Sequence, residues 1–286
     1  MTRLFDVYLA ADWSAANAPT RGKDSIWIAV RGVGTTPWCE NIATRNEAEE
    51  LLGDVISETL ARDERLLAGF DFAFGYPEGF AAKVTGAADW EAMWSAIAAQ
   101  IDDQPTNQSN RFAVGEALNE AFGAPVFWGK PHQQAALYPS LPTKRPDTDF
   151  PAQRAIEKHV SGAKSVFQLA YNGAVGSQTL LGIPALARLR GKTGAKIWPF
   201  ETQFTECLPD GPCAVFAEIY PSLLVARAPD GAVKDQAQVE AMADAMMAAD
   251  QQGTMVALLN PPAGVTATER AAMVREEGSI LGAGIL

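Results

Sequence analysis

Acidic residues stand at four places where an apolar segment meets a turn or a helix. Asp12 and Asp71 each follow a segment predicted as a strand. Glu218 lies near the end of a third such segment, and Asp235 opens a predicted helix. A carboxylate beside an apolar strand is costly to desolvate unless it is paired, hydrogen-bonded or bound to a cation.

Convergence of these four acids would make an all-oxygen site, which suits Mg²⁺ or Mn²⁺. Any one of them alone is more typical of a helix cap or a turn, where Asp is common. For the set in this order we favour a metal site, with Asp12, Asp71, Glu218 and Asp235 as its ligands.

Apolar runs predict the elements that must position these acids. Residues with a high preference for strands dominate the short runs. Two Thr–Glu pairs three residues apart, at Thr44 and at Thr266, are typical of capped helix starts. The predicted strands are 6–11, 25–30, 38–43, 66–70 and 214–220, and the main helices begin after Thr44, at Asp235 (235–250) and after Thr266.

The order of these segments is strand, strand, strand, helix, strand, insert, strand, helix, which predicts an α/β fold. The middle of the chain is rich in turns and in Gly and Pro, and Pro184 is expected to open a short helix at 185–190. We therefore predict a core made of residues 1–74 and 211–286, with an inserted helical subdomain at 75–210.

The apolar face of the helix at 235–250 decides which of its acids turns toward the sheet. Val239, Met242, Ala243 and Met246 define that face. Asp235 lies four residues before Val239 and shares the face, whereas Asp244 is expected to point mostly to solvent. The spacing favours Asp235 as the helix acid.

Charge is distributed unevenly along the 286 residues. The chain has 23 Lys and Arg against 34 Asp and Glu, a net charge of −11, which argues against a protein that coats nucleic acid. Between residues 128 and 200, however, there are ten bases and three acids, a balance of +7. This segment suggests a locally bound anion, and pairing with acidic surface elsewhere explains it equally well. The candidate substrate-binding residues are Lys164, Gln178, Arg188, Arg190 and Lys192.

Cysteine content and hydropathy indicate the compartment. An odd count of three cysteines predicts no disulfide framework. Acids interrupt the apolar residues at the start of the chain, and the longest uncharged stretch, 166–187, carries polar residues, glycines and a proline. We expect no signal peptide, no membrane span and a cytoplasmic location.

The order of elements and acids resembles the ribonuclease H-like superfamily. Its enzymes place an Asp on the first strand, an acid on the fourth and an Asp on the last helix. Asp12, Asp71 and Asp235 match those places, and Asp244 is the competing match on the helix. Glu218 has no fixed counterpart in that triad. The resemblance covers only the core. It implies a mixed sheet with flanking helices and metal-dependent phosphoryl chemistry, with Asp12, Asp71 and Asp235 as the catalytic residues.

Short segments spread along the chain resemble one uncharacterised bacterial family related to a ribonuclease H-like group of unknown function. Its members often carry the label of molybdopterin-guanine dinucleotide synthesis proteins. The residues do not support that chemistry, because Leu186 stands where a phosphate loop ending at Gly191-Lys192-Thr193 needs glycine. The segments are AADWSA (10–15), GFDFAFGYP (69–77), KSVFQLAYNGAVGSQ (164–178), WPFE (198–201), AEIYPS (217–222), KDQAQV (234–239) and EEGSILG (276–282).

Together these features favour metal-dependent hydrolysis of a phosphodiester in a nucleotide or a short nucleic acid, with Mg²⁺ or Mn²⁺ as the cofactor. The expected partner is therefore a phosphate-bearing small molecule or a short nucleic acid. The alternative is a non-catalytic accessory protein that binds a nucleotide-like cofactor, linked to molybdopterin-guanine dinucleotide synthesis. Under that alternative the four acids are structural.

Overall fold

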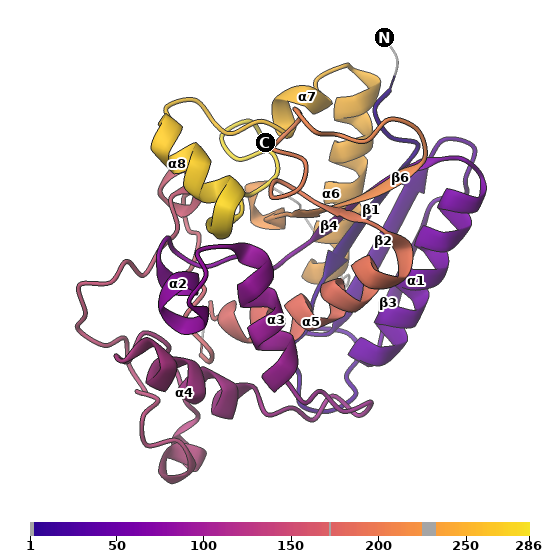
Figure 1. The fold of residues 1–286 in the computed structure, drawn as a ribbon. Coiled ribbons are helices and arrows are strands. Elements are labelled where there is room, and N and C mark those ends of the chain that lie inside the picture. Colours follow the sequence, from indigo (N-terminus) through magenta and orange to yellow (C-terminus); the bar gives the residue numbers. More distant parts are fainter. Residues whose placement is uncertain (1–2, 172, 225–232) are drawn as a thin grey trace.

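A mixed six-stranded sheet with helices on both faces forms the centre of the α/β structure (Figure 1). The structure is a computed structural model that describes residues 3–171, 173–224 and 233–286. The strand order is β3-β2-β1-β4-β6-β5. The strands are β1 (Val7–Asp12), β2 (Ile26–Gly32), β3 (Trp38–Ile42), β4 (Arg65–Phe70), β5 (Lys196–Ile197) and β6 (Cys213–Glu218).

Strand direction brings two of the acids to one edge of the sheet. β2 runs antiparallel to β1 and β3, whereas β1, β4, β6 and β5 run parallel to one another. Ala11 pairs with Phe70, and the amide of Asp71 donates a 3.0 Å hydrogen bond to the carbonyl of Ala11. The carboxyl ends of β1 and β4 therefore place Asp12 and Asp71 side by side.

Alternation of side chains along the strands separates the core into two apolar clusters, one on each face. Leu9 and Ala68 face α1 (Arg45–Ala61), whereas Ala10 and Leu67 face α6 (Lys234–Gln251). Both faces of β1 are buried, which explains why its sequence is continuously apolar rather than alternating.

Helix capping agrees with the sequence. The Thr44 side chain accepts a hydrogen bond from the amide of Glu47 at the start of α1. Thr266 and Glu269 form a complete capping box at α8 (Ala267–Ala272), and a single π-helical turn, η4 (Met273–Glu277), follows it.

Between β4 and β6 the chain forms mostly helices and turns. In Figure 1 α3 and α5 lie next to each other, and α4 lies further from the sheet. The helices of this region are α2 (Phe80–Thr85), α3 (Trp90–Gln100), α4 (Arg111–Phe122), η1 (His132–Leu137), η2 (Ile156–His159) and α5 (Gly176–Thr193). Two short helical turns lie outside it, η3 (Pro221–Leu223) and α7 (Met255–Leu258).

The start of α5 corrects one prediction. The helix begins at Gly176, not at Pro184, which lies inside it. The glycines that indicated a broken segment serve close packing instead. A Cβ on Gly176 would lie 2.3 Å from the carbonyl oxygen of Val166, and one on Gly182 would lie 2.2 Å from the Phe72 ring. Both glycines are therefore compatible with a continuous helix against its neighbours.

The inserted region shares its core with the sheet. One apolar cluster contains Leu9 and Ile56 of the predicted core together with Trp94 and Leu186 of the predicted insert. The division into residues 1–74 with 211–286 and 75–210 stays a prediction. Among the described residues, no helix is both long and apolar enough to cross a membrane.

Candidate functional site

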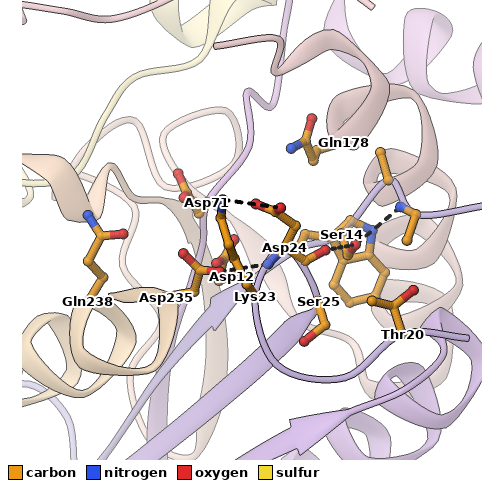
Figure 2. A pocket seen from close by; sticks show the side chains of 13 residues that line it. Asp12, Ser14, Thr20, Lys23, Asp24, Ser25, Asp71, Gln178, Asp235 and Gln238 are labelled. Atoms are coloured by element: carbon orange, nitrogen blue, oxygen red, sulfur yellow. Dashed lines mark hydrogen bonds and ion pairs between the residues drawn. The ribbon is translucent and has the colours of Figure 1, made fainter. Parts of the chain in front are cut away.

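A pocket of about 500 Å³ lies at the carboxyl ends of β1 and β4 (Figure 2). Its wall consists of the end of β1 and the loop that follows it (residues 12–16, 20 and 23–25), together with Asp71, Gln178, Asp235 and Gln238. Three of the acids predicted from the sequence thus meet in one cavity. Figure 2 shows the three carboxylates between Gln178 on one side and Gln238 on the other.

Arg45 at the start of α1 holds the loop that forms this wall. Its guanidinium is buried and donates hydrogen bonds of 3.0 Å to the carbonyl of Ser14 and 2.9 Å to the carbonyl of Ala16. The same guanidinium forms an ion pair with Asp103 of the inserted region. The pocket wall is therefore anchored to both the core and the insert.

Asp12 and Asp71 are the most perturbed acids of the pocket. Burial raises the pKa of Asp12 well above its usual value, and the charges of Asp71, Asp235 and Asp24 raise it further. Burial, Glu218 and Asp235 raise the pKa of Asp71 to about 7. Neither carboxylate has a hydrogen bond or ion pair with the described residues, so they are the groups that a bound cation would stabilise.

Asp235 enters the pocket from the first turn of α6, as the spacing predicts. One of its carboxylate oxygens accepts a 2.9 Å hydrogen bond from the amide of Asp24. Asp244 does not line the pocket; its half-exposed carboxylate forms a 2.6 Å ion pair with Arg31 of β2. The helix therefore presents Asp235, rather than Asp244, to Asp12 and Asp71.

Glu218 lies near Asp71, and its carboxylate already accepts hydrogen bonds from other residues. Arg154 donates to both of its carboxylate oxygens, at 2.6 and 2.7 Å, and the amide of Phe74 donates at 3.1 Å. Both side chains are almost fully buried. Glu218 does not line the pocket of Asp12 and Asp235, and its oxygens are held by these donors.

The bases of α5 are paired with acids away from the pocket. Arg188 and Lys192 both contact Glu49, at 2.7 and 3.5 Å. Arg190 pairs with Glu201 and Glu91, each at 3.0 Å. The sequence analysis offered two explanations for the basic segment, a bound anion or pairing with acidic residues elsewhere. For these three residues the structure shows the pairing.

The other two predicted binding residues lie nearer the carboxylates. Gln178, in the first turn of α5, lines the pocket itself. Lys164 is exposed and borders a separate small pocket of about 30 Å³ that also touches Asp71 and Glu218. Of the five residues predicted to bind substrate, only Gln178 shares the cavity of the three acids.

Lys23 and Asp24, which the sequence analysis did not single out, also line the pocket. They lie in the loop between β1 and β2, and the amide of Asp24 binds Asp235 from 211 residues away. The only local signal is the turn chemistry around Gly22. A turn residue becomes a site residue here through its contact with a distant helix.

The donor set of the pocket fits a hard divalent cation, because it consists of carboxylate, hydroxyl and amide oxygens. Within the described ranges, no three Asp, Glu, His or Cys side chains are already gathered closely enough to hold a metal ion. For a cation to be held here, the carboxylates of Asp12, Asp71 and Asp235 would have to lie closer together than they do in this structure.

No family model, no curated protein and no solved structure matches this chain. The function is therefore inferred from the site itself.

Proposed function

We propose that the protein is a metal-dependent phosphodiesterase whose active site is the pocket of Asp12, Asp71 and Asp235. One observation carries this proposal: three acids distant in sequence line a single cavity, and two of them have no counter-charge in direct contact among the described residues. Such an arrangement is unfavourable for folding, so it points to function rather than to structure.

The topology supports a ribonuclease H-like identity for the core. Three antiparallel strands are followed by parallel strands, with an acid at the end of β1, an acid after β4 and an acid in the last long helix, α6. This is the order of elements and acids that the resemblance implies. The three cysteines are free, which fits the cytoplasmic location that we propose with it.

Asp12, Asp71 and Asp235 would hold Mg²⁺ or Mn²⁺. A bound divalent cation supplies positive charge that lowers the pKa of water and stabilises the leaving oxygen of a phosphate ester. The chain itself orients the ligands: the sheet fixes Asp12 and Asp71, and the amide of Asp24 holds one oxygen of Asp235. Gln178 and Gln238 offer amide groups on either side to orient a substrate.

The experiment is hydrolysis of bis(p-nitrophenyl) phosphate with Mn²⁺, followed for the wild type, Asp12→Asn and Asp244→Asn. We expect metal-dependent hydrolysis, a loss of at least about 100-fold in Asp12→Asn and little change in Asp244→Asn. Undiminished hydrolysis in Asp12→Asn would refute the proposal. If the wild type does not hydrolyse the ester, the accessory-protein alternative is favoured, in which the pocket binds its ligand without catalysis.

A further inference from the structure

Lys23 is the one cationic side chain among the 13 described residues that line the pocket. Its side chain is 83% exposed, and its Nζ lies 3.9 Å from the carboxylate of Asp24. An exposed ion pair at this distance contributes little, so it does not hold the ammonium group in place. Lys23 therefore remains able to bind an anion that enters the cavity (Figure 2).

The turn that carries Lys23 is rigidly built. Gly22 and Asp24, on either side of it, both adopt left-handed backbone conformations, with φ of 86° and 58°. The carbonyl of Gly22 accepts from the Ser25 hydroxyl at 2.6 Å and from the Trp27 ring nitrogen at 2.9 Å.

The other side of the turn is held just as closely. The carbonyl of Asp24 accepts a 2.7 Å hydrogen bond from the Ser14 hydroxyl, and its amide donates to Asp235. A non-glycine residue with positive φ is uncommon, and it persists only where the surroundings enforce it. The backbone at Lys23 is thus fixed to the carboxylate cluster, while the side chain itself stays free.

The rest of the lining suits a small polar molecule. Besides the carboxylates, the described lining includes the hydroxyl of Thr20 and the amides of Gln178 and Gln238. A volume of about 500 Å³ is ordinary for a small-molecule site. Trp13, the only aromatic side chain in the described part of the lining, is 2% exposed and presents no open face on which successive bases could stack.

Polynucleotide binding needs a row of cations, one for each phosphate contacted. The bases of α5 do not form such a row at the pocket, because Arg188, Arg190 and Lys192 do not line it and point instead to Glu49 or Glu201. Lys234, at the start of α6, adds positive charge near Asp12 and Asp71 but does not line the cavity. Among the described residues, the lining therefore supplies one cationic side chain, which suits a single phosphate.

We propose that Lys23 binds the single phosphate of a nucleotide-sized phosphate ester, and that the substrate is such a small ester rather than a polynucleotide. This inference rests on the proposed function and narrows its substrate class. Lys23 would contact the phosphate, and the remaining hydroxyl and amide groups of the pocket would contact the rest of the ester.

The test is calorimetric titration of the protein, with and without Mn²⁺, against the four ribonucleoside 5′-monophosphates and against octathymidylate. The variants are Lys23→Met and Lys144→Met. Lys23→Met removes the charge and keeps a side chain of similar length. Lys144 is exposed and does not line the pocket, so its replacement is the control. A separate Mn²⁺ titration of each variant shows whether the metal site itself is intact.

We expect at least one monophosphate to bind the wild type, and Lys23→Met to weaken it about tenfold or more, because a charge-assisted hydrogen bond is lost. Lys144→Met should leave the affinity unchanged, and Lys23→Met should not weaken Mn²⁺ binding. Octathymidylate should bind no more tightly than the monophosphate, with no steeper salt dependence.

Two results would overturn this inference alone: equal monophosphate affinity in Lys23→Met and wild type, or tighter binding of octathymidylate with a steeper salt dependence. Failure of all four monophosphates to bind the wild type would also overturn it. Failure of Mn²⁺ to bind the wild type would instead refute the proposed function, and the metal-free titrations would still decide the role of Lys23.

Discussion

Asp71 is the acid of the pocket whose burial has the most direct consequence for stability. It follows a buried strand, and burial together with Glu218 and Asp235 raises its pKa to about 7. The unfolded chain ionises this group near its ordinary value of 3.8. As the pH rises from about 4 to about 7, the folded state therefore keeps a proton that the unfolded state releases, and the free energy of unfolding falls.

Replacing Asp71 with Asn removes this cost. Without metal, we expect Asp71→Asn to be more stable than the wild type above pH 7, by on the order of 1 kcal/mol. The advantage should fade as the pH falls from about 7 toward 4, because the wild-type carboxyl is then protonated. Urea denaturation of both proteins at a series of pH values measures this. A variant that is less stable than the wild type at pH 8 would contradict it.

At the scale of elements, the sequence predicted the helices and strands whose formation depends on neighbouring residues. Thr44 and Thr266 cap helices as their spacing indicates, and β1, β2 and β4 lie where apolar runs predicted strands. Elements that depend on distant partners were missed. The two-residue strand β5 exists only through its pairing with β6, and the first two turns of α5 were hidden by glycines that serve packing.

The same distinction applies to the site. Asp12, Asp71 and Asp235 could be selected because strand ends and helix periodicity are visible in sequence. The pairing of Glu218 with Arg154 could not be predicted from the sequence, because Arg154 lies 64 residues away from Glu218 in an irregular segment. The roles of Lys23 and Asp24 were equally hidden, since their turn reaches the pocket only when α6 packs beside it.

The packing of α5 against the sheet gives a test at this scale. Gly182 faces the buried ring of Phe72, which lies among the rings of Trp13, Phe70 and Phe74 and cannot easily move. We expect Gly182→Ala to lower the free energy of unfolding by about 1–3 kcal/mol through overpacking.

Gly191, in the same helix, is the matched control. A Cβ at this position meets nothing within 4 Å. Gly191→Ala should therefore stabilise the protein by up to about 1 kcal/mol through helix propensity alone. Chemical denaturation of the two variants measures both effects. If both substitutions stabilise the protein, α5 does not pack on Phe72 as described.

At the scale of the whole molecule, Arg154 joins three parts of the chain. From the insert it reaches Glu218 at the end of β6 and the carbonyl of Glu277 near the C-terminus, and it pairs with Glu157 of its own turn. Its side chain is 1% exposed. Removing one partner of such a buried network leaves the other charges uncompensated.

We expect Arg154→Met to lower the free energy of unfolding by about 3–5 kcal/mol. The exposed pair of Arg188 with Glu49 provides the control, and Arg188→Met should cost at most about 1 kcal/mol. Thermal and urea unfolding of both variants would show the difference. Equal, small effects would mean that the insert is not tied to the sheet through Arg154.

The central claim is that Asp12, Asp71 and Asp235 together hold a divalent cation, and calorimetric titration with Mn²⁺ tests it most directly. The account predicts that the wild type binds Mn²⁺, with an affinity that rises with pH through about 7 as Asp71 loses its proton. Asp12→Asn and Asp235→Asn should abolish binding, whereas Asp244→Asn should bind as the wild type does. Binding that persists in both Asp12→Asn and Asp235→Asn, or no binding to the wild type, would contradict the account.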